Sequence, residues 1–246
     1  MLLQNKIAVI TGNPYGIGRV SAALFAREGA KVVCIDDRTD GWGSGDAATE
    51  GAPHFMADVS DTKAVGRVVA ECKRTLERVD ILFNLAGRAV KQRFETTTEE
   101  TWQQMIARNL TAAFVCSQQF LPLMKKAHGA AIINHASIDG FLGNPSLAAY
   151  SAGKGGVIPL THVMAHDLGR YGIRVNCIST GGIRDGESRP EDAARVRVTP
   201  LGRTGTPEDV AHVALFLACE GSSYVNGANI VVDGGRTTIT QGCYED

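Results

Sequence analysis

Three polar residues in the second half of the chain have the types and spacing to move a proton. Tyr150 and Lys154 stand four residues apart in AYSAGKGG, so on a helix both side chains project from one face. Because an ammonium stabilises a nearby phenolate, we expect Lys154 to lower the pKa of Tyr150 from about 10 toward neutrality. Ser137 ends the run AAIINHAS, where its hydroxyl could hold a substrate oxygen. Each residue alone is ordinary, but the three together predict general acid–base chemistry.

A glycine-rich turn follows the first apolar run of the chain. The segment TGNPYGIG (11–18) places Gly12, Gly16 and Gly18 ahead of a helical pattern. Glycines let the backbone approach a pyrophosphate, and the free N–H groups at a helix start favour the anion. Since the spacing is G-x-x-x-G-x-G and not G-x-G-x-x-G, a plain turn between a strand and a helix stays open as the alternative.

Asp36 indicates which dinucleotide would fit such a turn. It ends the second apolar run, about 20 residues after the glycines, where a carboxylate accepts hydrogen bonds from an adenosine ribose. A 2′-phosphate at the same place would meet a negative charge and be repelled. The sequence therefore predicts NAD as the cofactor in preference to NADP.

The elements that must position these residues alternate along the chain. Short β-branched runs, apolar throughout like strands buried on both faces, alternate with longer segments at helical spacing. The expected strands are 7–10, 31–35, 54–57, 80–84, 130–134, 174–178 and 229–232, and the expected helices are 16–28, 61–78, 98–127, 147–170 and 206–220. This order predicts an α/β fold, a Rossmann-like, doubly wound parallel sheet of about seven strands with helices on both faces. We expect the segment 37–53 to be a surface excursion.

Composition and charge exclude several classes of protein. The chain has 246 residues, of which 44% are hydrophobic, which suits one folded domain over 1–246. With 25 Lys and Arg against 26 Asp and Glu, no basic field exists for nucleic acid or an anionic membrane. No secretion signal and no run of about 18 apolar residues occurs, so we expect a cytoplasmic protein. The six cysteines lack metal-site spacing and are expected to be reduced and mostly buried.

Further motifs stand in a fixed order along the chain: Asp58-Val59, NLAG (84–87), Asn109 and DGG (233–235). Together with the glycine turn, Ser137 and YSAGK, they make the chain resemble the short-chain dehydrogenase/reductase family over essentially its whole length. The resemblance implies a catalytic tetrad of Asn109, Ser137, Tyr150 and Lys154. The residues expected to bind the cofactor are Gly12, Asn13, Tyr15, Gly16, Ile17, Gly18, Asp36, Asp58, Val59, Asn84, Ala86, Gly87, Tyr150, Lys154, Gly181 and Ile183.

The resemblance and the residue chemistry imply the same reaction. Tyr150 would take the proton from a substrate hydroxyl while hydride leaves for the nicotinamide, and Ser137 would hold the substrate oxygen. Lys154 would stabilise the phenolate and bind the nicotinamide ribose, and Asn109 would hold a water in a proton relay to the lysine. We expect an NAD-dependent oxidoreductase that interconverts a small secondary alcohol and its ketone. An NADPH-dependent 3-oxoacyl-thioester reductase and a non-catalytic nucleotide sensor are the alternatives.

Two departures from the family pattern fall near the expected cofactor site. Leu85 replaces the polar second residue of N-N-A-G, which normally helps to tie neighbouring strands. After the sixth strand the family often reads P-G-x-I-x-T, whereas here Thr180 stands for the proline and Asp185 for the hydroxyl residue. A carboxylate at 185 would be repelled by a pyrophosphate unless it is turned away.

Two histidine arrangements suggest other chemistry. His162 and His166 have the i,i+4 spacing of a metal chelate, but without an accompanying glutamate a packed pair is the stronger interpretation, and no metal is expected. His135 and Asp139 flank Ser137, as in a hydrolase triad. Residues two apart on a strand rarely form a hydrogen bond between side chains, so this interpretation is weak.

Substrate and assembly are less strongly indicated. Arg88, Lys91 and Arg93 follow NLAG and favour an anionic group on the substrate, with a solvated loop as the alternative. The segment 183–200 carries four arginines but equal opposite charge, and adds nothing. The family resemblance implies a homotetramer, in which exposed apolar residues of 111–124 would be buried. Those named for this role are Ala113, Phe114, Leu121 and Leu123.

Overall fold

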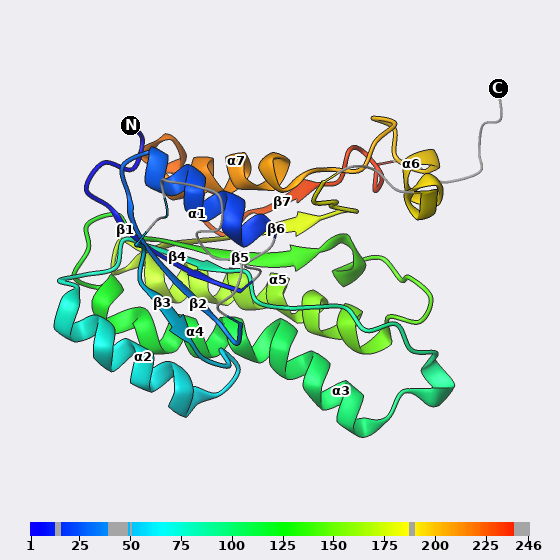
Figure 1. Cartoon of the computed structure of the whole chain (residues 1–246), viewed down its shortest axis with the longest axis horizontal. Helices are drawn as coiled ribbons and strands as arrows, with labels where there is room; N and C mark the ends of the chain where they lie inside the picture. The colour runs from blue at the N-terminus through cyan, green and yellow to red at the C-terminus, as the bar shows by residue number, and fades with distance from the viewer. Residues whose placement is uncertain (13–15, 39–48, 50, 187–189, 239–246) are drawn as a thin grey trace.

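Seven parallel strands form one sheet in the computed structural model of the chain (Figure 1), which describes residues 1–12, 16–38, 49, 51–186 and 190–238. The strands are β1 (Ile7–Thr11), β2 (Lys31–Asp36), β3 (His54–Met56), β4 (Ile81–Asn84), β5 (Ala131–Ser137), β6 (Arg174–Thr180) and β7 (Asn229–Val232). Their order across the sheet is β3-β2-β1-β4-β5-β6-β7. The chain thus runs outward from β1 on one side and returns to β4 on the other. The predicted fold class is confirmed, and a ligand of such a sheet binds at the carboxyl ends where this direction reverses.

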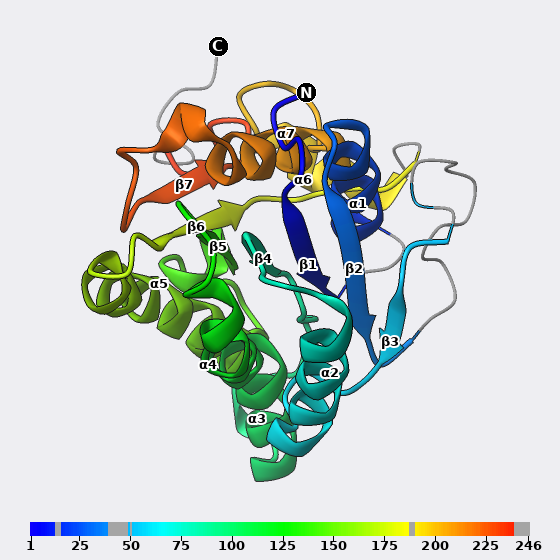
Figure 2. The same ribbon diagram turned by 90° about the vertical axis from the view of Figure 1, so that its left-hand side faces the viewer.

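Helices cover both faces of the sheet (Figure 2). One face carries α1 (Ile17–Arg27) and α7 (Pro207–Ala218), and the other carries α2 (Thr62–Thr75), α4 (Ala112–Met124) and α5 (Ala148–Gly169). The helix α3 (Glu99–Ile106) precedes α4, and the short helix α6 (Ala193–Arg197) precedes α7. The described chain also has single 3-10 turns at η2 (Phe94–Thr96), η4 (Ile138–Gly140), η5 (Pro190–Asp192) and η6 (Glu220–Ser222).

The core explains why the strand sequences are apolar without alternation. Ala8 and Ile10 of β1 pack with residues of α1 and α7, whereas Val9 packs with residues of α2 and α4. All three are fully buried, because successive side chains enter opposite layers that are both covered. A continuous apolar run is therefore what a central strand of this sheet requires.

The prediction of one continuous helix over 98–127 is wrong. The structure divides it into α3, a π-helical segment η3 (Ala107–Thr111) and α4. A π-helical turn inserts one extra residue and rotates the side chains that follow, which sequence periodicity at 3.6 residues does not reveal. Asn109 lies in this segment. The other predicted helices and strands are present with shifts of a few residues at their ends.

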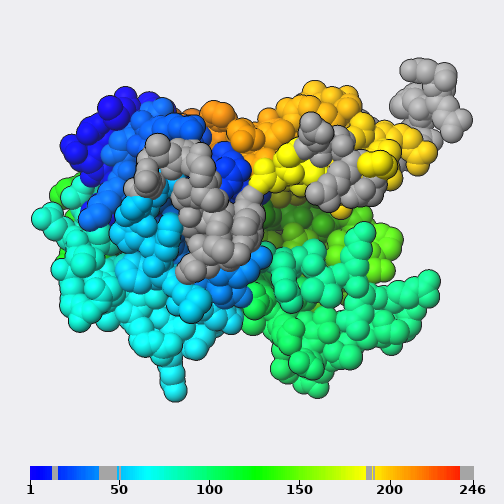
Figure 3. All heavy atoms as spheres, in the orientation of Figure 1, coloured from blue at the N-terminus to red at the C-terminus, as the bar shows by residue number. Residues whose placement is uncertain are grey.

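The carboxyl ends of the strands gather the polar residues singled out in the sequence. Both β5 and β6 extend beyond the predicted bounds, and Ser137 pairs in register with Thr180 at their last positions. Asn84 pairs with Thr11 on one side and with Asn134 on the other. In the space-filling view of Figure 3, α6 (yellow) lies above α3 (green) at this end of the molecule.

The structure also bears on the expectations about cysteines, membrane spans and the segment 37–53. Five cysteines are free and buried, as predicted, and Cys243 lies outside the described residues. No helix in the described ranges has both the length and the apolar character to cross a membrane. Most of the expected surface excursion 37–53 also falls outside the description, which covers only 37, 38, 49 and 51–53 of it.

Candidate active site and dinucleotide site

The turn after β1 fits a close approach of backbone to a ligand. Gly12 has φ +83, and a Cβ added to it would lie 2.4 Å from Cα of Ala86, so a side chain is excluded at this position. The helix α1 begins at Ile17 with Gly16 as its N-cap, and no described side chain caps it. Its first turn carries no acidic residue, so its free amides suit an anion such as a pyrophosphate. Gly18 is buried in this first turn, while Asn13 and Tyr15 lie outside the described residues.

A cavity of about 290 Å³ lies beside this turn, at the ends of β2 and β4. It is lined by five residues expected from the sequence, namely Asp36, Asp58, Val59, Ala86 and Gly87. Its other lining residues are Asp37, Arg38, Ser60, Arg88 and Arg108. The carboxylate of Asp58 accepts hydrogen bonds from the backbone N–H and the hydroxyl of Ser60, at 2.9 and 2.7 Å, which holds it at the cavity wall. Together with the turn, the cavity fits the adenosine half of a dinucleotide.

The carboxylate of Asp36 is buried, 6% exposed, and burial raises its pKa to about 6. It accepts hydrogen bonds from the backbone N–H of Arg38 at 2.9 Å and from the Nε of Arg38 at 3.4 Å. Beside it, the guanidinium of Arg108 donates to Asp37 at 2.9 Å. Burial raises the pKa of Asp37, but the hydrogen bond with Asp36 and then that with Arg108 lower it, and the pKa is lowered in all. The sequence analysis missed both arginines, and Arg108 comes from η3, far along the chain. Two cations therefore stand against two carboxylates where the ribose would lie.

The side chain of Asn84 belongs to a buried hydrogen-bond network. Its side chain is buried and donates to the Ser117 hydroxyl and to the Asn134 side chain, each at 2.9 Å. Asn134 in turn donates to the hydroxyl of Thr161 on α5 at 2.9 Å. Asn84 lines neither this cavity nor the next one. The side chain of Asn84 joins β4 to β5, α4 and, through Asn134, α5, and its expected place beside the cofactor stays a prediction.

A second cavity, of about 670 Å³, holds the residues expected to do chemistry. Ser137 and Tyr150 line it together, with Thr180, Gly181 and Ile183. Apolar wall comes from Ile138, Pro145, Leu147, Ala194 and Val198. The hydroxyl of Ser137 accepts a hydrogen bond from the backbone N–H of Asp139 at 3.1 Å. A phenol and a hydroxyl thus face the same space at the carboxyl edge of the sheet.

The expected effect of Lys154 on the pKa of Tyr150 is wrong in this structure. Burial is the main cause acting on the phenol and raises its pKa, the hydrogen bond with Ser137 lowers it, and the charge of Asp139 raises it again. Lys154 itself is 1% exposed, and burial lowers its pKa to about 7. Burial disfavours the charged phenolate more than the hydrogen bond with Ser137 favours it, which is the physical reason for the difference.

The ammonium of Lys154 lies between the two cavities. Its Nζ donates to the backbone oxygen of His135 at 2.7 Å. A Cβ on Gly87, which lines the first cavity, would lie 3.2 Å from the same Nζ. Tyr150, one helical turn earlier on α5, lines the second cavity. Lys154 therefore lies where the part of a dinucleotide between its adenosine and its nicotinamide would pass.

Asn109 is placed by the π-helical segment. It is 2% exposed, and its Nδ2 donates to the backbone oxygens of Arg88 and Met105, each at 3.0 Å. Its Oδ1 is buried and has no partner among the described residues. A Cβ on Gly87 would lie 2.5 Å from this oxygen. The structure therefore gathers Asn109, Gly87 and Lys154 in one place, with a free acceptor among them.

His135 is a residue whose role the sequence analysis missed. Its Nε2 lies 3.1 Å from the hydroxyl of Thr180, and its Nδ1 lies 3.4 Å from Nζ of Lys154. Alternation along β5 gave the only signal, since it directs His135 to the same side as Ser137. No hydrogen bond joins His135 to Ser137 in the part of the chain described, and the Asp139 carboxylate accepts from Asn144. The hydrolase triad is therefore wrong.

Asp185, in the loop after β6, has a cationic partner. Its carboxylate lies 3.7 Å from the guanidinium of Arg19, in the first turns of α1. An ion pair there offsets the negative charge near the proposed pyrophosphate position. Gly181 has no room for a side chain, because a Cβ on it would lie 2.8 Å from Cβ of Asp233.

The three cations after NLAG separate in the structure. Lys91 lines the second cavity, Arg88 lines the first, and Arg93 is exposed and lies 3.5 Å from Glu95. Two cations that the sequence analysis did not single out for the substrate, Arg195 and Arg236, also line the second cavity. The three cations predicted from the sequence thus do not share one cavity. The cations that line the second cavity come from three distant segments of the chain.

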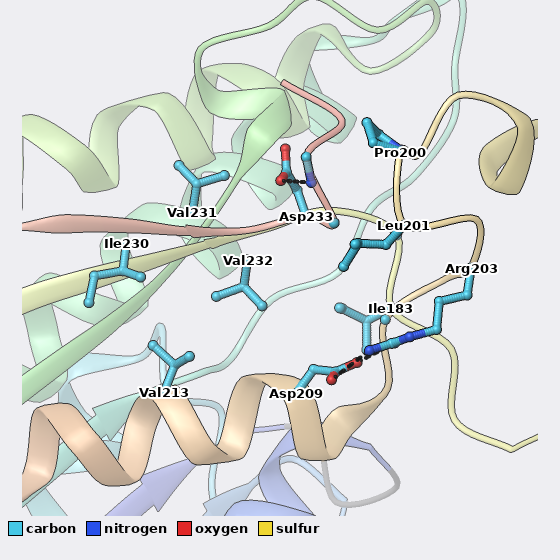
Figure 4. A pocket seen from close by; sticks show the side chains of 14 residues that line it. Ile183, Pro200, Leu201, Arg203, Asp209, Val213, Ile230, Val231, Val232 and Asp233 are labelled. Atoms are coloured by element: carbon cyan, nitrogen blue, oxygen red, sulfur yellow. Dashed lines mark hydrogen bonds and ion pairs between the residues drawn. The ribbon is translucent and has the colours of Figure 1, made fainter. Parts of the chain in front are cut away.

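A third cavity, of about 520 Å³, lies between β7, α7 and the loop before α7 (Figure 4). Its walls are apolar, with Val213, Ile230 and Val232 pointing toward it. The charged pair at its edge, Arg203 and Asp209, is joined by hydrogen bonds of 2.6 and 3.0 Å. It contains no group of the expected tetrad, whereas Ser137 and Tyr150 line the second cavity.

The histidines with chelate spacing on α5, His162 and His166, are exposed, and His166 lies 3.0 Å from the carboxylate of Asp167. Within the described ranges, no group of three or more His, Cys, Asp or Glu side chains is arranged to hold a metal ion.

Comparison with known proteins shows the family of the chain. A family model described as enoyl-(acyl carrier protein) reductase matches residues 11–237. The chain is 37% identical over 243 residues to a 3-oxoacyl-(acyl-carrier-protein) reductase of Thermotoga maritima, over 96% of this chain and 99% of that one. The chain belongs to the short-chain dehydrogenase/reductase family. It is therefore an NAD(P)-dependent oxidoreductase that acts on CH–OH groups.

Two further members of this short-chain family show its range. The chain is 34% identical to an NAD-dependent glycerol dehydrogenase of Listeria innocua, over 96% of this chain and 95% of that one. The solved structure of an aldohexose dehydrogenase of Thermoplasma acidophilum, 24% identical, superposes with a TM-score of 0.89 over 99% of this chain and 98% of that one. The structural likeness concerns the fold alone.

Proposed function

We propose that the protein is an NAD-dependent dehydrogenase of a small secondary alcohol, and the reductase of the corresponding ketone. The observation that carries the proposal is the shared cavity of Ser137 and Tyr150, with Lys154 and Asn109 buried directly beside it. The nicotinamide cofactor supplies the hydride acceptor when it is bound. The residues of the chain supply the proton transfer and the alignment of the substrate oxygen.

Each of the four residues has a distinct part in this proposal. Ser137 donates its hydroxyl to the substrate oxygen, since its own oxygen is already held by the backbone of Asp139. Tyr150 takes the hydroxyl proton of the alcohol as general base, or gives it to the ketone as general acid. Lys154 holds the nicotinamide ribose, and Asn109 offers its unpartnered Oδ1 to a water on the path of the proton.

The preference for NAD rests on Asp36. Its carboxylate lies at the end of β2 in the wall of the first cavity, and above about pH 6 it is ionised. It can then accept hydrogen bonds from the free ribose hydroxyls and repel a 2′-phosphate.

A specific observation favours the NADPH-dependent 3-oxoacyl-thioester reductase as second candidate. Arg38 and Arg108 line the same cavity as Asp36 and offer charge-assisted hydrogen bonds to a phosphate. The relative from Thermotoga maritima is named as a 3-oxoacyl-(acyl-carrier-protein) reductase. A screen of NAD against NADP over polyols, cyclic alcohols, hydroxy acids and 3-oxoacyl thioesters tests the proposal. Faster turnover of a thioester with NADPH would replace the first candidate by the second.

The third alternative, a nucleotide sensor without turnover, has less support because the groups needed for proton transfer are all present in one place. Binding of NAD without oxidation of any alcohol in the panel would favour the sensor. The same screen therefore separates all three candidates.

We also propose that the substrate carries an anionic group. Four charged residues line the second cavity: three cations, Lys91, Arg195 and Arg236, and one carboxylate, Asp139. Arg195 lies 3.2 Å from Asp192, which leaves part of its guanidinium available. The cations attract a carboxylate, sulfonate or phosphate at the end of the substrate away from Tyr150.

A matched pair of substitutions tests this charge preference. Arg236→Gln is expected to raise KM for an anionic alcohol about tenfold and to leave the neutral analogue unchanged, whereas Arg93→Gln, outside the cavity, changes neither. Equal use of neutral and anionic analogues by the unmodified protein would refute the proposal.

A homotetramer is the proposed assembly. Phe114 on α4 is 46% exposed and Val163 on α5 is 58% exposed, so both helices present apolar side chains outward. Ala113 and Leu123, named in the sequence analysis, are buried in the core of the chain itself and are corrected. Light scattering at micromolar concentration tests the assembly, and a monomeric mass would refute it.

A further inference from the structure

A line of polar groups runs from Lys154 to the wall of the second cavity. Lys154 Nζ lies 3.4 Å from Nδ1 of His135, and Nε2 of the same ring lies 3.1 Å from the hydroxyl of Thr180. Thr180 lines the cavity that contains Tyr150. His135 and Thr180 are diagonal neighbours on adjacent strands, because Ser137 pairs in register with Thr180. The ring is therefore held at both nitrogens.

The chemistry of the donors decides how protons are arranged along this line. In its charged form Lys154 has donors and no acceptor, so Nδ1 of His135 then accepts from it and carries no proton. A neutral imidazole then carries its proton on Nε2, which donates to Oγ1 of Thr180. The threonine hydroxyl keeps its own proton for an acceptor in the cavity. All hydrogen bonds consequently run in one direction, from the lysine toward the substrate.

The charges around the ring agree with a neutral imidazole. Burial and the nearby ammonium of Lys154 hold the pKa of His135 well below its usual range. The other titratable groups at this place are Tyr150, on the same helix as Lys154, and Asp139, whose charge acts on Tyr150. A protonated ring would place two cations in contact, which is unfavourable.

We propose that His135 is the positioning residue of Lys154, held in its Nε2–H tautomer by the hydroxyl of Thr180. The imidazole gives the buried ammonium a second acceptor besides the backbone oxygen of His135, at 2.7 Å. This directs Nζ toward Gly87 and Asn109, where the proposed ribose contact requires it. Thr180 is essential to the arrangement, because a proline, which the family often has at this position, offers no hydroxyl to hold the ring.

The tautomer can be measured without any turnover. Protein labelled with ¹⁵N-histidine is examined by long-range ¹⁵N–¹H correlation at about pH 7 and about pH 6, just below the usual histidine pKa. His135→Asn identifies the signal of this ring, and His166→Asn, on the exposed surface, is the control substitution. We expect one neutral Nε2–H ring at both pH values. An Nδ1–H tautomer, or a ring that is charged at about pH 6, would overturn the proposal.

Kinetic variants test the positioning itself, and this part rests on the proposed function. His135→Leu removes the acceptor and is expected to lower kcat/KM by about 10- to 100-fold, the usual effect of losing a hydrogen bond to a charged group. It should also shift the pH profile, since the pKa of Lys154 falls further when an acceptor is replaced by an apolar group. His135→Asn, which keeps an acceptor, should recover most of the loss.

The pair Thr180→Val and Thr180→Ser keeps the test decisive if the leucine variant does not fold. The serine variant should retain the ¹⁵N pattern of the ring, and the valine variant should change it. Equal pH profiles in His135→Leu and the unmodified protein would refute a positioning role. If no alcohol or ketone is turned over at all, the proposed function fails, but the tautomer measurement still decides whether the hydrogen-bonded line exists.

Discussion

Replacing Gly87 by alanine tests whether Asn109 and Lys154 act as one unit beside the cofactor site. A Cβ at this position would lie 2.5 Å from Oδ1 of Asn109 and 3.2 Å from Nζ of Lys154, with φ +152 for the residue itself. To reach ordinary contact, the asparagine oxygen must move by about 1 Å. An overpacked site of this kind costs about 1–3 kcal/mol of stability.

Two effects of Gly87→Ala follow from these distances. The midpoint of thermal unfolding should fall by about 2–12 °C, since 1 kcal/mol corresponds to about 2–4 °C in a chain of this size. A displacement of about 1 Å at catalytic groups should lower kcat/KM for alcohol oxidation by about 100-fold. Circular dichroism melting and initial rates with the best alcohol of the screen measure the two effects.

A matched control separates the site from the general effect of adding a methyl group. A Cβ on Gly143, in the exposed loop before α5, meets nothing within 4 Å. Gly143→Ala should therefore melt and react like the unmodified protein. If Gly87→Ala folds and keeps kcat/KM within about twofold of the unmodified protein, the reasoning that the two side chains act together at Gly87 is refuted.

Three further outcomes are expected. Tyr150→Phe should keep its melting temperature and lose about 10²- to 10⁴-fold in kcat, the usual share of general acid–base catalysis; retention of more than a few per cent of kcat would assign the proton transfer to another group. Burial raises the pKa of Tyr150 and the hydrogen bond with Ser137 lowers it. Below that pKa, kcat/KM for oxidation should rise about tenfold per pH unit, and Ser137→Ala should move this rise to higher pH. An unchanged midpoint of the pH profile in Ser137→Ala would contradict this. The preference for NAD should weaken as pH falls through about 6, because the Asp36 carboxylate then gains a proton. Fluorescence titrations measure both affinities, and Asp36→Ala should remove their pH dependence. A ratio of NAD to NADP affinities that is constant with pH in the unmodified protein would refute this role of Asp36.

Local patterns in the sequence were sufficient for the fold and for the edge of the sheet where the candidate site lies. Continuous apolar runs predict strands buried on both faces, and alternation with helical segments predicts a parallel sheet. Because all strands of such a sheet point one way, residues at their ends, such as Asp36, Ser137 and Thr180, must share an edge. The spacing of Tyr150 and Lys154 likewise placed both on α5, since a helix brings residues four apart to one face.

The tertiary structure decided which polar groups are partners. Arg108 pairs with Asp37 across 71 residues, and Lys91, Arg195 and Arg236 come to one cavity from three segments. No periodicity in the sequence contains such information, because these contacts depend on how loops from different strands pack.

The same is true of the buried polar groups. The π-helical segment turns Asn109 inward, and burial lowers the pKa of Lys154 while the ring of His135 lies against it. A pKa depends on the surroundings of a group in three dimensions and on the charges that packing brings near it. The sequence by itself therefore determined the residue types and the edge of the sheet where they stand, and only the packed structure decided their partners and their charge.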